Sequence, residues 1–198
     1  MNWVSAGELV EGAKAKVAEM EEAASRDLQW KLGEEALALA ERAVAEDPGD
    51  AEAHLSVAIV LGKISFLRPP RERIKDSARI RDAALKAVEI DPDYGLAHFV
   101  LGRWHYELAN LGAGAKFFAE MLFGELPEAS NESAVKYLER ARDLDGGLMT
   151  RAELGRAYLA VGRTEEARAQ LRAAVASEAI DADEREAQAR ARQALQDL

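Results

Sequence analysis

The sequence contains no cysteine, and this absence excludes several kinds of chemistry at once. Without thiols the chain forms no disulfide bond, binds no metal through thiolates and has no cysteine nucleophile. The absence leaves the redox compartment undecided, because disulfides are the feature that would mark an oxidising one. Stability and function therefore depend on packing, charge and the remaining polar side chains.

Long apolar runs are also missing. No stretch reaches the roughly 20 apolar residues that a membrane-spanning helix needs. The first residues, 1–5, lack the basic region followed by an apolar region that marks a signal peptide. The sequence therefore predicts no integral membrane segment and a cytoplasmic location, with export as the alternative if a signal peptide has been removed.

Positive charge is in deficit along the chain. Lys and Arg number 26 against 36 Asp and Glu, which gives a net charge of −10. An acidic surface repels phosphate backbones, and the sequence has no clustered basic face of the kind that binds nucleic acid. The densest basic stretch, residues 68–81, also holds Glu72, Asp76 and the Pro69-Pro70 pair, and we interpret it as a solvated loop and helix start. Nucleic acid is not expected as a partner.

Strong helix formers dominate what is present. Ala, Leu, Glu and Arg are abundant, whereas Val and Ile are scattered and never form the alternating runs that mark strands. A chain of 198 residues buries a core of its own and is most simply one domain, residues 1–198. The composition predicts an all-α protein.

Self-similarity along the chain indicates a repeat. The segment at residues 43–48 (AVAEDP) resembles that at 87–92 (AVEIDP), and each is followed at the same distance by Ala-His, at Ala53-His54 and Ala97-His98. A third segment of the chain has its glycine, alanine, leucine and tyrosine residues at the spacing of the tetratricopeptide repeat, which is about 34 residues long. That segment comprises Leu154, Gly155, Tyr158, Gly162, Ala167, Leu171 and Ala174. The pattern predicts a tetratricopeptide-type helical-hairpin solenoid of about four hairpins.

The expected hairpins follow from the turn signals. Gly33 is expected in the first turn, and Pro69-Pro70 in the second, because proline is tolerated at a helix start but not inside one. The paired segments are then 7–30 with 34–46, 51–66 with 72–90, 95–144 as a long third hairpin, and 148–178 as a fourth.

Two further features complete this map. The third hairpin is longer than the plain repeat, which predicts an insert helix within residues 113–130. Asp181 with Glu184 predicts the cap of a final helix that closes the stack, and Thr150 with Glu153 is a second candidate cap.

The departures from the plain repeat point to one family. His54 and His98 stand where the repeat often has Trp, and the insert contains residues 116–123 (KFFAEMLF). Residues across 35–178 resemble the regulators of microtubule dynamics, helical proteins named from their animal members. They are Ala97, His98, Gly102, Trp104, Met121, Leu122, Phe123, Pro127, Ala134, Tyr137 and Ala141.

The resemblance implies the fold and the groove shape of that family. Animal members are associated with microtubules, and some sit at membrane contact sites and are linked to lipid handling. From these residues we expect no membrane anchor of the kind those members carry, and the richness in alanine and arginine is typical of bacteria, which lack conventional microtubules. Fold therefore carries over, but cytoskeletal function is not implied.

Catalytic and metal-binding patterns are weak. His54 and His98 occupy equivalent places in successive hairpins, and His105 follows seven residues later, so they are not expected to converge on a metal and are interpreted as packing residues. The sequence has no Gly-rich phosphate loop, nucleophile elbow or His-Glu-x-x-His helix. Acidic pairs such as Glu165-Glu166 are interpreted as solvated charge. We expect no enzyme activity, no metal and no cofactor.

The first helix of each hairpin is expected to line a concave groove. Groove-facing offsets give Leu55, Ile59, Lys63, Phe99, Arg103, Tyr106, Met149, Arg156 and Leu159. An apolar groove with a few arginines suits an amphipathic peptide, or an acyl chain with an anionic head group held by Arg103 and Arg156. Equally, these apolar residues could pack against the insert helix or the terminal helix, with Phe117, Phe118 and Phe123 filling the groove.

These observations favour a non-catalytic module that binds a peptide or protein segment. The alternative is a lipid-binding or lipid-carrying domain that uses the same groove, with an anionic lipid as ligand. A structural subunit within an assembly is a third interpretation, and the sequence does not define the oligomeric state.

Overall fold

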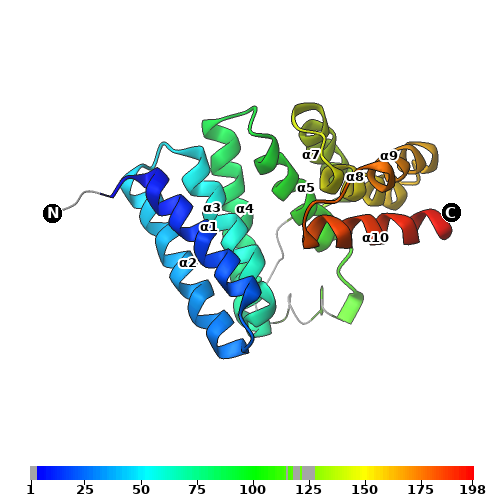
Figure 1. Cartoon of the computed structure of the whole chain (residues 1–198). Coiled ribbons are helices and arrows are strands. Elements are labelled where there is room, and N and C mark those ends of the chain that lie inside the picture. The colour runs from blue at the N-terminus through cyan, green and yellow to red at the C-terminus, as the bar shows by residue number, and fades with distance from the viewer. Residues whose placement is uncertain (1–3, 115, 118–120, 122–127) are drawn as a thin grey trace. The chain divides into compact units, whose positions relative to one another are not determined.

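The computed structural model describes residues 4–114, 116–117, 121 and 128–198, and every regular element among them is a helix. The chain divides into two compact units, residues 1–97 and 98–198 (Figure 1). Each unit has buried apolar clusters of its own, as hairpins of a repeat protein do when they pack on their neighbours. The expectation of an all-helical protein built from hairpins is confirmed.

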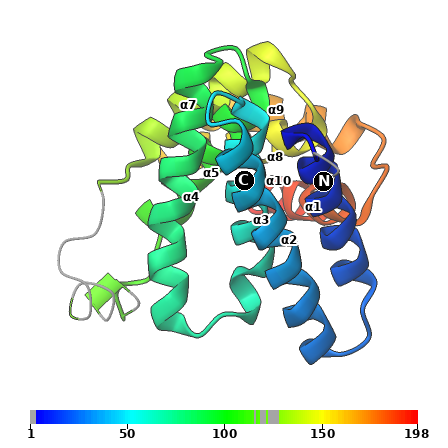
Figure 2. The same cartoon turned by 90° about the vertical axis from the view of Figure 1, so that its left-hand side faces the viewer.

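The first unit contains two antiparallel hairpins. Helix α1 (Ala6–Glu22) pairs with α2 (Arg26–Glu46), and α3 (Ala51–Ile64) pairs with α4 (Pro70–Ile90) across the short 3₁₀ helix η1 (Ser65–Leu67). Figure 2 shows the chain turning between α3 and α4. Pro70 is the first residue of α4, where its missing N–H and fixed φ do no harm. The second expected hairpin is therefore confirmed.

The first turn differs from the expected one. Residues 23–25 separate α1 from α2, and the Ser25 hydroxyl accepts a hydrogen bond from the Leu28 N–H at 3.3 Å as an N-cap. Gly33 lies inside α2 and not in a turn. A Cβ atom at Gly33 would lie 2.6 Å from Ile64 Cγ2, so this glycine serves the close approach of α2 to α3.

The second unit contains the other two hairpins and a closing helix. Helix α5 (Gly95–Ala109) begins at the end of the first unit and pairs with α7 (Asn131–Leu144). Helix α8 (Leu148–Ala160) pairs with α9 (Thr164–Ala176) around Gly162, whose φ of 76° is a conformation that glycine adopts without strain. The insert helix expected within 113–130 lies largely outside the described residues.

The final helix, α10 (Ala182–Gln196), packs on α8 and α9. The Asp181 carboxylate accepts a hydrogen bond from the Glu184 N–H at 2.8 Å, as the capping pattern predicted. Ala187 and Ala191 are fully buried in a cluster with residues of α8 and α9. The Gln188 amide donates to the Ser177 carbonyl at 2.7 Å, which satisfies an orphan carbonyl group after α9.

The second candidate cap was wrong. Helix α8 begins at Leu148 with Gly147 as its N-cap, so Thr150 and Glu153 lie within the helix, and both are buried. The pattern of a hydroxyl followed by a carboxylate three residues later occurs here on an interior face of a helix. Glu153 has a different role, described below.

Glycine also sets the spacing between helices in the second unit. A Cβ atom at Gly155 would lie 2.6 Å from both Cγ and Cδ2 of Leu171, and one at Gly102 would lie 2.5 Å from Leu138 Cγ. Contacts this short are not found in real proteins, so α8 approaches α9, and α5 approaches α7, only because these positions lack a side chain. Both leucines are fully buried.

We predict that Gly155→Leu lowers the free energy of unfolding by about 3 kcal/mol or more, because the new side chain must displace Leu171 from a packed interface. The measurement is the thermal unfolding midpoint followed by circular dichroism. Gly62→Ala is the control, since Gly62 is a helical glycine with no neighbouring atom within 4 Å of an added Cβ. That change should be neutral or stabilising by up to about 1 kcal/mol. Equal midpoints for wild type and Gly155→Leu would contradict the assigned contact.

Candidate functional site

The second unit has a pocket of about 420 Å³ at one end of three helices. Its walls come from α5, α8 and the C-terminal end of α10. The lining residues are Tyr106, Asn110, Arg156, Leu159, Ala160, Ala194, Asp197 and Leu198. The pocket thus combines an aromatic ring and aliphatic groups with amide, guanidinium and carboxylate groups.

Helical periodicity brings these side chains to one place. Arg156 and Leu159 lie three residues apart on α8 and share one face of that helix. Tyr106 lies on α5, and Asn110 follows directly after the end of that helix, with its N–H donating to the Tyr106 carbonyl at 3.1 Å. The opposite face of α8 is buried, with Tyr158 only 2% exposed in the core. Packing of one face therefore presents the other face to the pocket.

Arg156 is the central charge of the pocket, and it is already paired. Its Nη1 atom lies 2.7 Å from Glu153 Oε2 and 3.8 Å from Glu107 Oε1. Its guanidinium lies over the Tyr106 ring, with Cζ 4.6 Å from the ring centroid, in a cation–π arrangement. Two carboxylates and an aromatic face thus hold this cation in position.

Glu153 is the reason for this pairing. Its side chain is only 3% exposed, and a buried carboxylate is costly unless it is paired. Arg156 and Arg190 supply the pairs, with Arg190 Nη2 at 3.5 Å, so the carboxylate also links α8 to α10. Burial alone would lower the pKa of Arg156, but Glu153, Tyr106 and Glu107 together raise that pKa above its ordinary value. The arginine therefore stays charged and remains bound to Glu153.

The pocket contains three of the residues expected from the sequence to line a groove: Tyr106, Arg156 and Leu159. Met149 is half-buried and packs on the core of the second unit, and Phe99 is 7% exposed within that core. Arg103 is exposed on α5 and is not among the described residues that line the pocket.

The remaining expected groove residues lie on α3, in the first unit. Leu55 is buried, with 1% of its surface exposed, and Ile59 is half-buried. The Lys63 ammonium group forms an ion pair with Glu21 at 2.5 Å. The structure thus places Leu55 in the interior, Ile59 partly in the interior and Lys63 in an intramolecular ion pair.

The sequence analysis assigned no role to five of the lining residues: Asn110, Ala160, Ala194, Asp197 and Leu198. Asn110 lies one turn beyond Tyr106, and the spacing that identified Tyr106 extends to it. Ala194, Asp197 and Leu198 could not be found in that way, because the final helix was expected to close the stack or to pack on the groove residues, and not to line a pocket.

The histidines make aromatic and backbone contacts. His54 Nε2 lies 3.0 Å from the Pro48 carbonyl oxygen. The rings of His98 and His105 lie 5.9 Å and 5.4 Å from the Tyr137 ring, and His105 is stacked on it. These contacts support the packing role expected of His54 and His98. Among the described residues no three His, Asp or Glu side chains are arranged to hold a metal ion.

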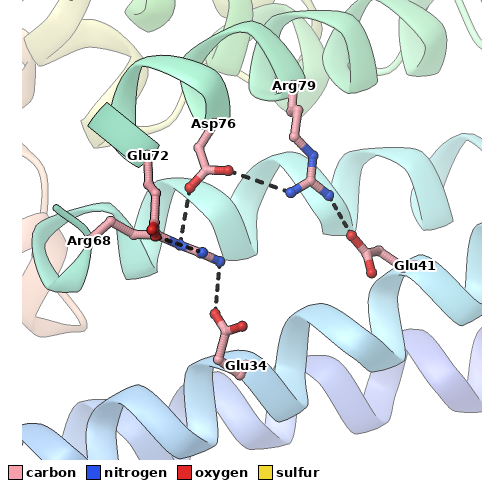
Figure 3. Close-up of polar contacts among 6 residues, drawn as sticks. All are labelled: Glu34, Glu41, Arg68, Glu72, Asp76 and Arg79. Atoms are coloured by element: carbon pink, nitrogen blue, oxygen red, sulfur yellow. Dashed lines mark hydrogen bonds and ion pairs between the residues drawn. The ribbon is translucent and has the colours of Figure 1, made fainter. Parts of the chain in front are cut away.

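A second polar cluster, not foreseen from the sequence, lies in the first unit (Figure 3). Arg68 precedes α4, and its side chain is only 12% exposed. Its guanidinium reaches Glu34 on α2 at 2.7 Å and Asp76 on α4 at 3.0 Å, and Glu72 lies at 3.5 Å. The Trp30 ring lies against the guanidinium, at 5.1 Å from Cζ to the ring centroid.

This Arg68 cluster corrects the interpretation of residues 68–81 as a solvated loop and helix start. Asp76 is 5% exposed, and it pairs with both Arg68 and Arg79, while Arg79 also contacts Glu41 on α2. The arginines therefore fasten the start of α4 to α2. All the carboxylates and both arginines shown in Figure 3 are engaged with one another, which indicates a structural role.

Within the described residues, no helix has the length and apolar character required to cross a membrane. Comparison with known proteins identifies the family. The family model described as "Regulator of microtubule dynamics protein 1-3" matches residues 9–198. The chain belongs to this family, which confirms the resemblance seen in its sequence.

Two relatives illustrate the extent of the similarity. Regulator of microtubule dynamics protein 3 of Rattus norvegicus is 28% identical over 131 residues, which are 65% of this chain and 28% of that protein. Regulator of microtubule dynamics protein 1 of Caenorhabditis elegans is 36% identical over 90 residues, which are 45% of this chain and 39% of that protein. The matched region is thus well under half of each relative.

A solved structure supports the fold. A thermophilic tetratricopeptide-repeat protein of Thermus thermophilus has a TM-score of 0.57 to this chain at 20% identity. The similarity covers 94% of this chain and 92% of that one. At this identity the likeness concerns the fold alone, and it confirms the tetratricopeptide-type architecture.

We predict that Asp76→Ala destabilises the protein by about 3 kcal/mol, because it leaves Arg68 and Arg79 without the buried carboxylate that both share. The measurement is the urea midpoint of unfolding. Glu72→Ala is the matched control, since the Glu72 side chain is 49% exposed and meets Arg68 only at 3.5 Å. Its loss should cost no more than about 1 kcal/mol. Equal effects of the two changes would show that the Arg68 cluster does not depend on the buried carboxylate.

Proposed function

We propose that this family member is a non-catalytic protein-interaction module that binds a peptide segment of a partner in the pocket of its second unit. One observation carries the proposal: residues of α5, α8 and the C-terminal end of the chain surround an open pocket of about 420 Å³. Binding sites commonly combine an apolar wall with a few oriented polar groups. Leu159, Ala160 and Ala194 supply the apolar part here, and Asn110, Arg156 and Asp197 supply the polar part.

The position of the pocket within the repeat supports the same function. Helices α5 and α8 are the first helices of their hairpins, which are the helices expected to line a groove. Tyr106, Arg156 and Leu159 were expected there from their offsets, and each lines the pocket. Arg156 and Tyr106 are held by the contacts described above, so the wall is organised before a ligand arrives, which lowers the entropic cost of binding.

The pocket gives less support to the alternative of a lipid-binding domain. An anionic head group would need Arg156, whose guanidinium is already paired with the buried Glu153 at 2.7 Å. It would also lie beside the Asp197 carboxylate. Both features disfavour a phosphate or carboxylate ligand, whereas a peptide backbone or a polar side chain meets no such charge conflict.

The names of the relatives refer to microtubule dynamics. That activity belongs to proteins of which this chain matches 28% to 39% of the length in the two cases above. For this chain we propose binding of a protein segment, with no commitment to a cytoskeletal partner.

The proposal is tested by filling the pocket. Ala160 is exposed at the end of α8 and lines the pocket, so Ala160→Trp places a large side chain at its mouth without disturbing the core. Peptides selected from a phage-displayed random library against the wild-type chain are the probe, and fluorescence anisotropy gives their dissociation constants. We expect Ala160→Trp to weaken the selected peptides by about tenfold or more, which corresponds to about 1.4 kcal/mol.

Ala169→Trp is the matched control. Ala169 is exposed on α9 and does not line the pocket, so this variant should bind the peptides as the wild type does. Equal binding by Ala160→Trp and wild type would contradict the proposal. A lipid that co-purifies with the wild type in native mass spectrometry, and is lost in Ala160→Trp, would instead establish the lipid-binding alternative.

A further inference from the structure

We infer that the occupant of the pocket is a cationic side chain, lysine or arginine, from a basic amphipathic segment of a protein partner. The inference rests on the proposed function and specifies its ligand. It gives the opposite charge preference to the one expected from the sequence, where Arg103 and Arg156 were assigned to an anion. The inference is argued from the hydrogen bonds and charges of three lining residues, Arg156, Asn110 and Asp197.

The one cation that lines the pocket is neutralised within the described residues. The Arg156 guanidinium pairs with Glu153 at 2.7 Å and with Glu107 at 3.8 Å, and Glu153 also pairs with Arg190 at 3.5 Å, so the two cations and two carboxylates of this network balance. Glu153 is buried and cannot move into solvent without leaving Arg190 as well. An incoming anion would therefore compete with a pre-formed intramolecular pair and would meet the exposed carboxylate of Glu107.

The amide of Asn110 is oriented as an acceptor. Its Nδ2 atom donates to the Tyr106 carbonyl at 2.7 Å and to Asn131 Oδ1 at 2.6 Å, so both N–H groups are used. Its carbonyl oxygen is what remains for a ligand. A ligand group that contacts Asn110 would therefore be a hydrogen-bond donor.

Asp197 adds a carboxylate to the same wall. Its Oδ1 atom accepts a hydrogen bond from the Gln193 amide at 3.0 Å, and no ion pair engages it within the described part of the chain. Its negative charge is therefore not compensated by a neighbour. A carboxylate, an amide carbonyl and an aliphatic wall of Leu159 and Ala194 match the ammonium or guanidinium head and the methylene stem of a basic side chain.

The charge of the whole chain points in the same direction. With a net charge of −10, the protein attracts basic partners over distances longer than the contact itself. Arg103 lies one turn before Tyr106, but it does not line the pocket among the described residues and does not change the sign of its wall.

The inference is tested by charge. Three fluorescein-labelled peptides of one amphipathic helical pattern carry lysine, glutamine or glutamate on the polar face, and anisotropy measures their binding to the full chain. We expect the lysine peptide to bind more tightly than the glutamine peptide and the glutamate peptide to bind least. Asp197→Asn should weaken the lysine peptide by about three- to tenfold, and should leave the glutamine peptide unchanged.

Glu178→Gln is the matched control, because it removes one negative charge from an exposed loop of the same unit and does not touch the pocket. If Glu178→Gln and Asp197→Asn lower the affinity for the lysine peptide equally, the effect comes from the overall charge of the protein. That result would overturn the assignment of the ligand to the pocket. Tighter binding of the glutamate peptide, or no binding of the lysine peptide, would also overturn it.

The composition of the library-selected peptides separates this inference from the proposed function. Enrichment in lysine and arginine supports both. Peptides that are acidic or neutral but lose affinity for Ala160→Trp overturn the cationic ligand and leave peptide binding in the pocket intact. Peptides that bind Ala160→Trp as tightly as the wild type would contradict binding in the pocket.

Discussion

The close contact of a glycine with a large aliphatic side chain is the constraint on which the packing of both units depends. Gly33 admits Ile64, Gly102 admits Leu138, and Gly155 admits Leu171, each where an added Cβ would lie within 2.6 Å of the partner. Helices that approach so closely also bury the residues beside the contact. Where such a residue is charged, it must be paired within the protein, and this requirement shapes the polar structure of both units.

Asp76 and Glu153 show the same solution in different places. Each is a carboxylate with no more than 5% of its surface exposed, each lies on a helix of a tightly packed hairpin, and each is held by two arginines. In the first unit the arginines belong to the Arg68 cluster, which fastens the second hairpin to the first. In the second unit one of the arginines also forms part of the pocket wall. The interior of the repeat thereby determines the charge that a ligand would meet.

Much of the fold could be predicted from the sequence, because alanine, glycine and leucine at tetratricopeptide offsets report helix packing directly. The first turn was misplaced because Gly33 resembles a turn residue when its neighbour Ile64 is unknown. The site was harder to predict. Offsets identified Tyr106, Arg156 and Leu159, since they concern one helix at a time. They could not show that Arg156 is bound by a buried carboxylate, because the burial of Glu153 depends on how the helices pack. They also could not show that the end of α10 completes the wall, because that contact joins separate helices.

Glu153 has a consequence for how partner choice can diverge among relatives. It does not line the pocket, yet it determines whether Arg156 is available to a ligand. A neutral residue at position 153 would remove the shorter of the two carboxylate contacts of the Arg156 guanidinium while every lining side chain kept its identity. Under the proposed function, the pocket would then tolerate an anionic ligand better, although its lining residues would be unchanged. Under the proposed function, the charge preference of the pocket would therefore depend on a residue behind its wall, and a comparison of relatives by their lining residues alone would not detect this difference.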